Sequence, residues 1–283
     1  MGNFLGKERV VERISDQPKA QKRIFEVESA GKTFEFVEFI AREPSDTLLL
    51  RLPAIGINAE EEAEGVHYSM EQKYNTLTLK EYGDEYSHDA LKHAVEKAIR
   101  ASGKRHAILH GTSFGAGVIY DLMSDPGDTD FAKSNNIKGA ILETPALGKN
   151  AFNKRFRTVS DSILIASGVK ISRMVSASGA GTGTVGYRKP GQELKPNIMA
   201  ELFRQKTDGR KLHIPLHVVF AEDDHLIDNA KTLEILKSQC TDLSFETVPS
   251  TAKSLRHQID YGRVWKKERA VIDRFILGAA DPS

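Results

Sequence analysis

The sequence feature that most constrains the fold is an apolar run that ends at a serine flanked by glycines. Residues 106–117 read His-Ala-Ile-Leu-His-Gly-Thr-Ser-Phe-Gly-Ala-Gly, with Ser113 two positions from Gly111 and from Gly115. The Gly-x-Ser-x-Gly spacing between a strand and a helix is typical of a sharp turn that holds the serine clear of a sheet. Small neighbours are needed because the backbone of such a turn is strained. The pattern predicts a strand, a tight turn and a helix, with Ser113 as a candidate nucleophile.

Strand-like runs alternate with helix-like segments along most of the chain. Two strands at the start are separated by Gly31, which favours a hairpin turn. The predicted strands are residues 22–29, 33–40, 47–53, 75–79, 106–109, 137–142, 212–220 and 243–248. The predicted helices are residues 59–74, 89–102, the segment from Ser113 to 124, 227–236 and 264–277. This alternation predicts an α/β fold in which helices cover both faces of a mainly parallel central sheet.

One segment interrupts the alternation and is predicted to be an inserted helical cap. Residues 148–210 contain helical patches around a Gly-rich tract but no clean β-α unit. The prediction is a core of residues 1–147 and 211–283 with a cap of residues 148–210. Residues 149–211 contain 13 Lys and Arg against four Asp and Glu, a net charge of +9 within a chain whose total is +1. Such a cap either presents a solvated basic surface or attracts anionic substrates or an acidic lipid surface.

The overall composition excludes several classes of protein. With 40 Lys and Arg against 39 Asp and Glu, the net charge gives no attraction to nucleic acid. Cys240 is the single cysteine, which excludes an intrachain disulfide and fits a reducing compartment such as the cytoplasm. We expect no signal peptide in residues 1–23, which lack an unbroken apolar run, and no stretch approaches the ~18 apolar residues of a membrane span.

A serine hydroxyl needs partners before it can act as a nucleophile. A histidine must take its proton, and a carboxylate must orient that histidine. Residues 222–224, Glu-Asp-Asp, follow the apolar run that ends at Phe220, near the predicted carboxyl end of a strand. Catalytic groups collect at that end of the strands in parallel α/β sheets. His257 follows the last predicted strand and precedes the last predicted helix, so the chain offers Ser, Asp and His in that order.

With these residues in this order, the sequence resembles the α/β-hydrolase superfamily over nearly its whole length. The resemblance is strongest for the cap-bearing lipase, lysophospholipase and serine-aminopeptidase-like branch. In that family the acid closes a Gly-x-x-Asp segment after a late strand. Residues 221–224 match this segment with Ala for Gly, which implies Asp224, with Asp223 and then Asp228 as alternatives. The family histidine lies in the loop before the last helix, which implies His257.

The resemblance also implies an oxyanion hole made by two backbone N–H groups. Phe114, directly after Ser113, supplies one of them. Family members tend to carry His-Gly after the third strand, but residues 52–57 here read Leu-Pro-Ala-Ile-Gly-Ile. The second donor therefore stays open between Ile55 and Ile57. No cofactor or metal is implied.

Two other motifs do not lead to a binding site. Residues 181–186 satisfy Gly-x-Gly-x-x-Gly, but no strand precedes them and Pro190 forbids a following helix, so we expect no dinucleotide binding. His213 and His217 share a face of a predicted strand. Pro215 between them and the lack of a clustered third ligand argue against a metal site.

The expected activity is that of a serine hydrolase that cleaves a carboxylic ester or thioester through an acyl-enzyme intermediate. The expected substrate is a small molecule with an acyl or lipid-type chain, and the basic cap would suit an anionic one or a transient contact with a lipid surface. Acyl transfer, peptide hydrolysis and a binding protein that retains the fold without catalysis are the alternatives. The sequence leaves the oligomeric state open.

Overall fold

Nine strands form one sheet in the order β1-β2-β3-β5-β4-β6-β7-β8-β9. The computed structural model describes residues 10–15, 21–54, 58–82, 87–124, 131–154, 207, 209–250, 257 and 259–278. The strands are β1 Val10–Ser15, β2 Lys22–Ser29, β3 Lys32–Phe39, β4 Thr47–Leu52, β5 Asn75–Leu79, β6 His106–Thr112, β7 Ile137–Glu143, β8 Leu216–Ala221 and β9 Leu243–Val248. The described helices are α1 Ala59–Ser69, α2 His88–Ser102, α3 Phe114–Ser124, α4 Phe131–Ser134, the short 3-10 helix η1 Lys149–Ala151, α8 Asn229–Gln239 and α9 Tyr261–Leu277.

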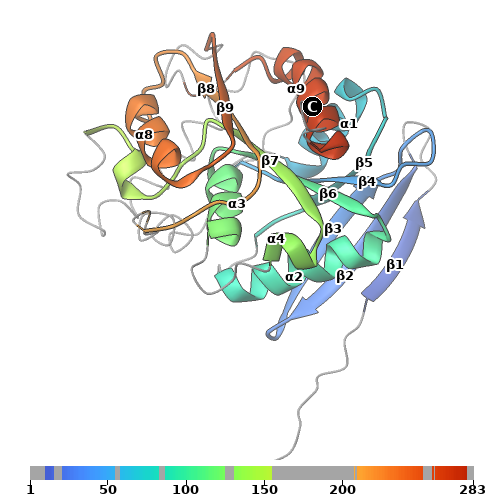
Figure 1. Ribbon diagram of the computed structural model, residues 1–283. Coiled ribbons are helices and arrows are strands. Elements are labelled where there is room, and N and C mark those ends of the chain that lie inside the picture. Colours follow the sequence, from blue (N-terminus) through green and yellow to red (C-terminus); the bar gives the residue numbers. More distant parts are fainter. Residues whose placement is uncertain are drawn as a thin grey trace, which may run out of the picture.

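The sheet is parallel from β5 to β9 and antiparallel at the β1–β3 edge (Figure 1). Leu52 pairs with Gly111 where β4 and β6 end, and Thr112 pairs with Glu143 where β6 and β7 end. The carboxyl ends of the three central strands therefore lie side by side, directly at the turn that contains Ser113.

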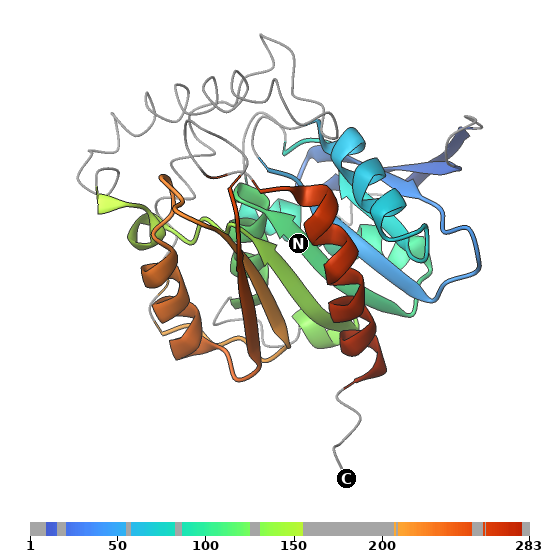
Figure 2. The ribbon, with the colours of Figure 1, turned by 90° about the horizontal axis from the view of Figure 1, so that it is seen from above.

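Helices cover both faces of the sheet, with α1 and α9 on one face and α2 and α3 on the other (Figure 2). The alternation of side chains along β4 shows the two cores. Leu48 and Leu50 pack in the larger core with α2 and α3, whereas Leu49 packs with Trp265 of α9 and Val66 of α1. This arrangement confirms the predicted α/β fold with a mainly parallel sheet between helical layers.

Local turn and cap residues place the ends of several elements, and the hairpin at Gly31 and the helix end at Gly103 are as predicted. The hairpin between β2 and β3 turns at Ala30 and Gly31, with φ of 49° and 75°, which matches the left-handed turns that fit the twist of two antiparallel strands. Helix α2 begins after Ser87, whose side chain accepts the N–H of Ala90, and ends at Gly103 with φ of 68°.

Two predicted boundaries are wrong for identifiable reasons. The helix predicted over 59–74 ends at Ser69, because Glu71 and Gln72 adopt φ of 55° and 54° and turn the chain toward β5. The strand predicted over 212–220 begins only at Leu216, directly after Pro215, which has no N–H for a ladder. Strand β1 and helix α4 were not predicted.

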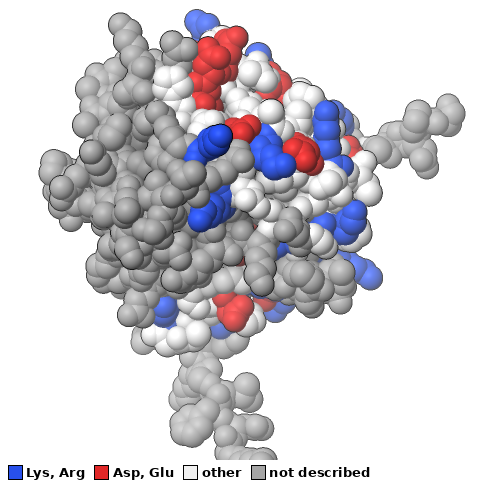
Figure 3. Space-filling model, turned by 90° about the vertical axis from the view of Figure 1, so that its left-hand side faces the viewer, with Lys and Arg blue, Asp and Glu red and all other residues white. Residues whose placement is uncertain are grey.

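Most of the predicted cap and the whole Gly-rich motif at 181–186 lie outside the described residues. On the molecular face in Figure 3, Lys and Arg of the described part alternate with Asp and Glu, without one continuous patch of either sign. No helix within the described ranges combines the length and the apolar character that crossing a bilayer requires.

Candidate active site

Ser113 occupies a strained turn between β6 and α3. Its φ is 52°, in the left-handed region that costs a residue with a side chain about 1–2 kcal/mol. Its N–H donates to the carbonyl of Glu143 at 2.8 Å, and its carbonyl accepts the N–H groups of Gly117 at 3.1 Å and Ala146 at 3.2 Å. Bonds on both sides of the residue thus hold the turn in this conformation.

The two flanking glycines are required by close backbone contacts. A Cβ at Gly111 would lie 2.7 Å from the carbonyl carbon of Gly115 and from Cδ1 of Ile119. A Cβ at Gly115 would lie 2.0 Å from the carbonyl oxygen of Leu52. The first turn of α3 is therefore pressed against the ends of β6 and β4, and only residues without side chains fit there.

A continuous chain of hydrogen bonds joins Ser113, His257 and Asp224. Oγ of Ser113 lies 2.8 Å from Nε2 of His257, and Nδ1 of His257 lies 2.7 Å from Oδ2 of Asp224. Because an ionised carboxylate only accepts, Nδ1 carries the proton, which leaves Nε2 of a neutral ring to accept the serine O–H. Asp224 and His257 are buried, and Ser113 is partly exposed.

The loop after β8 holds the Asp224 carboxylate in one orientation. Oδ1 accepts the N–H groups of Leu226 at 2.7 Å and Ile227 at 2.9 Å, while Oδ2 faces the histidine. The side-chain amide of Asn153, next to η1, donates to the carbonyl of Asp224 at 3.0 Å. The segment around η1 therefore supports this loop from outside the sheet.

The two alternative acids lie in the loop after β8 and at the start of α8. Asp223 is exposed, with φ of 54°. Asp228 caps α8, where its side chain accepts the N–H of Lys231 at 2.9 Å. Of the three candidate acids, Asp224 is the one whose carboxylate hydrogen bonds to His257.

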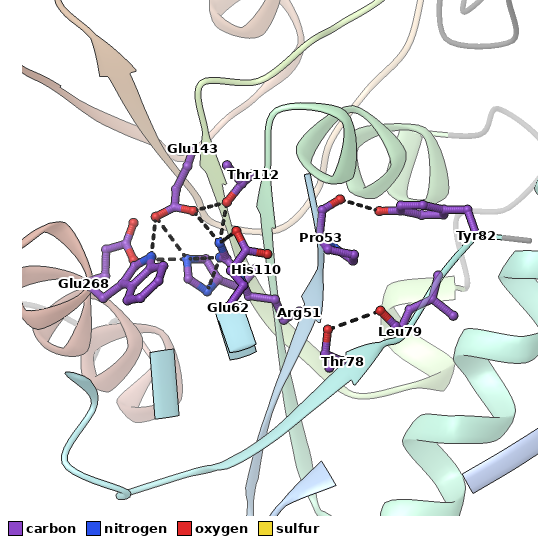
Figure 4. A network of polar contacts seen from close by, with 11 residues as sticks. Arg51, Pro53, Glu62, Thr78, Leu79, Tyr82, His110, Thr112, Glu143 and Glu268 are labelled. Carbon is purple, nitrogen blue, oxygen red and sulfur yellow. Dashed lines mark hydrogen bonds and ion pairs between the residues drawn. The ribbon is translucent and has the colours of Figure 1, made fainter. Parts of the chain in front are cut away.

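Phe114, the first residue of α3, is buried beside the loop that follows β4. Its ring packs edge-on against Tyr82, with centroids 4.9 Å apart. The hydroxyl of Tyr82 donates to the carbonyl of Pro53 at 2.9 Å (Figure 4). Tyr82, which we did not predict, thus connects Phe114 to this loop. Ile55 and Ile57, the two candidates for the second oxyanion donor, lie outside the described residues.

A buried charged cluster lies between the sheet and helices α1 and α9, and we did not predict it. Arg51 of β4 contacts Glu62 of α1 at 2.8 Å and Glu143 of β7 at 2.9 Å. His110 of β6 lies 2.8 Å from Nη1 of Arg51 and 3.1 Å from Glu268 of α9. The five side chains are fully buried. We call these five residues the buried charged cluster. Three of them, Arg51, His110 and Glu143, lie within or directly after apolar runs that are predicted strands, and a polar residue at such a position is the signal that the sequence contains.

Three members of the cluster have the spacing of metal ligands. Donor atoms of His110, Glu143 and Glu268 lie within 4.8 Å of one another. The guanidinium of Arg51 already contacts both Glu143 and His110, so a metal ion would have to share this space with a fixed positive charge. The residues therefore suit an internal ion-pair network better than a metal centre.

The cluster contains three carboxyl groups for one arginine, and their pKa values diverge. Burial raises the pKa of Glu62 and of Glu268. Burial would also raise the pKa of Glu143, but attraction by Arg51 and then His110 outweighs it and lowers the value to about 2. Glu143 is thus the carboxylate that balances Arg51, whereas Glu62 and Glu268 retain protons to higher pH.

His213 and His217 do not share a strand face. Strand β8 begins at Leu216, so His213 is an exposed residue of the preceding segment. His217 is buried in β8, and its Nδ1 lies 2.9 Å from the hydroxyl of Ser244. The predicted pairing of these histidines on one face is therefore wrong.

Sequence comparison gives no match to a family model or to a curated protein. The structure is similar to solved structures along almost its whole length. A monoglyceride lipase from Saccharomyces cerevisiae, solved with a substrate analogue, has a TM-score of 0.60 at 11% identity and covers 96% of both chains. An esterase from a Rhodococcus species has a TM-score of 0.60 at 18% identity, covering 89% of this chain and 99% of its own.

A further similar structure is the bottromycin epimerase BotH in complex with bottromycin A2. It has a TM-score of 0.57 at 14% identity and covers 88% of this chain and 98% of its own. Proteins of this shape therefore include two named for ester cleavage and one named for epimerisation. At these identities the similarity concerns architecture and not substrate. The chain has the α/β-hydrolase fold, as its resemblance to that superfamily predicts.

Proposed function

We propose that the protein is a serine hydrolase that cleaves a carboxylic ester or thioester. The observation that carries the proposal is the unbroken hydrogen-bond chain from Ser113 Oγ through His257 to Asp224, at 2.8 Å and 2.7 Å. Ser113 lies on a left-handed turn at the carboxyl end of β6. This combination of a strained turn, a base and an orienting acid is the arrangement that activates a serine for acyl transfer.

In the proposed reaction Ser113 Oγ attacks the acyl carbonyl while Nε2 of His257 takes the hydroxyl proton. The C–O or C–S bond then breaks, and the imidazolium gives its proton to the leaving alcohol or thiol. Water attacks the acyl-enzyme in the same way and releases the free acid and the serine. Asp224 stabilises the imidazolium and fixes its tautomer. The N–H of Phe114, with that of Ile55 or Ile57, would bind the oxyanion.

We further propose that residues 148–210 form a cap over this site and that the substrate carries an acyl or lipid-type chain. The support for an anionic substrate is the sequence charge of +9 over residues 149–211. Positive charge near a site raises the local concentration of anions, and added salt screens it.

The test is hydrolysis of p-nitrophenyl esters of increasing chain length and of acyl-CoA thioesters by wild type and Ser113→Ala. We expect wild type to release acid and the variant to lose turnover by about a thousandfold or more. Hydrolysis that survives Ser113→Ala would contradict the proposal.

The anionic preference is tested separately, by comparing acyl-CoA with a neutral ester at about 20 mM and about 300 mM salt. Steering by the cap predicts that salt lowers kcat/KM for acyl-CoA and leaves the neutral ester unchanged. An equal response of both substrates would contradict it.

A further inference from the structure

The carboxyl end of β7 contacts Ser113 through its main chain. The carbonyl of Glu143 accepts the Ser113 N–H at 2.8 Å, and the Ala146 N–H donates to the Ser113 carbonyl at 3.2 Å. Glu143 also lies opposite Thr112 in the parallel pairing of β6 and β7. The main-chain groups on both sides of the Ser113 side chain are therefore bonded to the segment that begins at Glu143.

The side chain of Glu143 is fixed by three other elements. Its Oε1 accepts the indole N–H of Trp265 of α9 at 2.8 Å, and its Oε2 accepts from Arg51 of β4 at 2.9 Å. The hydroxyl of Thr112, at the end of β6, accepts from Arg51 and donates to Glu143 (Figure 4). Thr112, the residue directly before Ser113, is thus bonded to a buried carboxylate that also accepts from Arg51 and Trp265.

We propose that Glu143 and Thr112 are positioning residues for Ser113: the buried carboxylate, acting through the Thr112 hydroxyl, holds the left-handed turn that directs Oγ toward His257. This inference rests on the proposed function, because it assigns a role in the same reaction. Both residues would act through Ser113 and not through a bond to the substrate. The distance of 2.8 Å between Oγ and Nε2 depends on where the turn places Ser113.

Turnover should depend on this link because the reaction rate is sensitive to the position of the reacting group. Ser113 adopts φ of 52°, a conformation that persists only where the surroundings enforce it. A displacement of about 1 Å at a reacting group can lower the rate by about a hundredfold. Loss of the link between Thr112 and Glu143 should therefore reduce turnover more than substrate affinity.

Two substitutions at Thr112 test the link with matched shapes. Thr112→Val keeps the branched shape and removes the hydroxyl, whereas Thr112→Ser keeps the hydroxyl and removes a methyl group. For p-nitrophenyl butyrate we expect Thr112→Val to lower kcat about tenfold or more with KM changed less than about twofold. Thr112→Ser should retain kcat within about threefold of wild type, because it preserves the bond to Glu143.

A second matched pair tests the carboxylate. Glu143→Gln and Glu38→Gln each remove a buried carboxylate with an arginine partner, since Glu38 of β3 bonds to Arg23 and Asn75. Both variants should unfold at lower temperature than wild type, but Glu143→Gln alone should lower kcat of the folded protein. If Glu143→Gln does not fold, the Thr112 pair decides the question.

Equal kcat for Thr112→Val, Thr112→Ser and wild type would overturn the positioning role, and so would a kcat loss in Glu38→Gln as large as that in Glu143→Gln. Labelling by a fluorophosphonate probe separates this failure from failure of the proposed function. If the probe labels wild type and Thr112→Val at the same rate, positioning is wrong and the serine hydrolase proposal stands. An unlabelled wild type would overturn both.

Discussion

Asp224 uses its two carboxylate oxygens for different tasks. Oδ1 accepts two main-chain N–H groups that close the loop after β8, and Oδ2 faces Nδ1 of His257. An asparagine could keep the first task with its carbonyl oxygen. Its amide nitrogen would then face the Nδ1–H of His257, so two donors would meet and the ring would lose its tautomer and orientation.

Because the two oxygens of Asp224 have different partners, Asp224→Asn should impair catalysis and leave the fold intact. The variant should fold like wild type but lower kcat on p-nitrophenyl esters by about a thousandfold or more. Asp223→Asn is the matched control, because Asp223 is exposed in a left-handed conformation that asparagine adopts readily. Its kcat should stay within about threefold of wild type. Equal losses in the two variants would reassign the acid.

Among individual residues, the sequence predicted those site residues that follow a known motif spacing. The spacing of Gly111, Ser113 and Gly115 has a direct geometric cause, namely the contacts that a side chain on either glycine would meet. No such rule points from Tyr82 to the Pro53 carbonyl, because that bond depends on how β4 and β5 pack. The second oxyanion donor, Ile55 or Ile57, stays a prediction.

At the scale of elements, the first turn of α3 and the end of β4 are in direct backbone contact. A Cβ at Gly115 would lie 2.0 Å from the carbonyl oxygen of Leu52, and a backbone atom cannot move aside as a flexible side chain can. In contrast, a Cβ at Gly262 in α9 would lie 3.8 Å from Oδ1 of Asp260, with no closer neighbour.

Alanine in place of these two glycines should change the free energy of unfolding in opposite directions. Gly115→Ala should lower the free energy of unfolding by about 3 kcal/mol and reduce turnover, because α3 must shift away from β4. Gly262→Ala should raise it by about 0.5 kcal/mol, because alanine restricts the unfolded chain and favours a helix. Urea unfolding of both variants checks the prediction. A stable, fully active Gly115→Ala would show that the close approach is not required.

Element boundaries show what local pattern can and cannot predict. The apolar runs at 22–29, 75–79 and 243–248 coincide with β2, β5 and β9, because each run is bounded by turn-forming or polar residues. The end of α1 differs, since nothing in its sequence indicates that Glu71 and Gln72 adopt left-handed conformations. Tertiary contacts set that boundary: the N–H of Arg42 donates to the carbonyl of Gln72.

At the scale of the whole molecule, the buried charged cluster connects the sheet to both helices on one face. Arg51, Glu62, His110, Glu143 and Glu268 come from five different elements and meet in the interior. The sequence could not predict this meeting, because Arg51, His110 and Glu143 are single polar residues at apolar runs, and Glu62 and Glu268 lie within charged stretches typical of a solvated helix face. Their partners are distant in the chain and are brought together by the fold.

The cluster predicts how stability depends on pH. A carboxyl group with a raised pKa binds its proton more tightly in the folded state, so its contribution to stability is lost as pH rises through that pKa. Glu268 is such a group, raised by burial and by Glu143 despite His110 and Arg51 nearby. Glu143, with a pKa lowered to about 2, has the opposite effect and loses its contribution as pH falls below about 4.5.

Glu268→Gln removes the loss of stability that Glu268 causes as the pH rises, since glutamine is neutral at every pH. Relative to wild type, this variant should become progressively more stable as the pH rises above about 4.5, the ordinary pKa of a glutamate, until Glu268 has lost its proton in the folded protein. Thermal unfolding at several pH values measures the difference. A constant difference between variant and wild type across this range would mean that Glu268 does not titrate in the folded protein.

The proposed function depends above all on Ser113 being a nucleophile that His257 and Asp224 activate. The most direct measurement is mass spectrometry of the intact protein and of its peptides after treatment with a fluorophosphonate, which reacts with activated serines. We expect one adduct, located on Ser113, absent from Ser113→Ala and formed far more slowly in Asp224→Asn. No adduct on the folded wild-type protein, or an adduct that persists in Ser113→Ala, would contradict it.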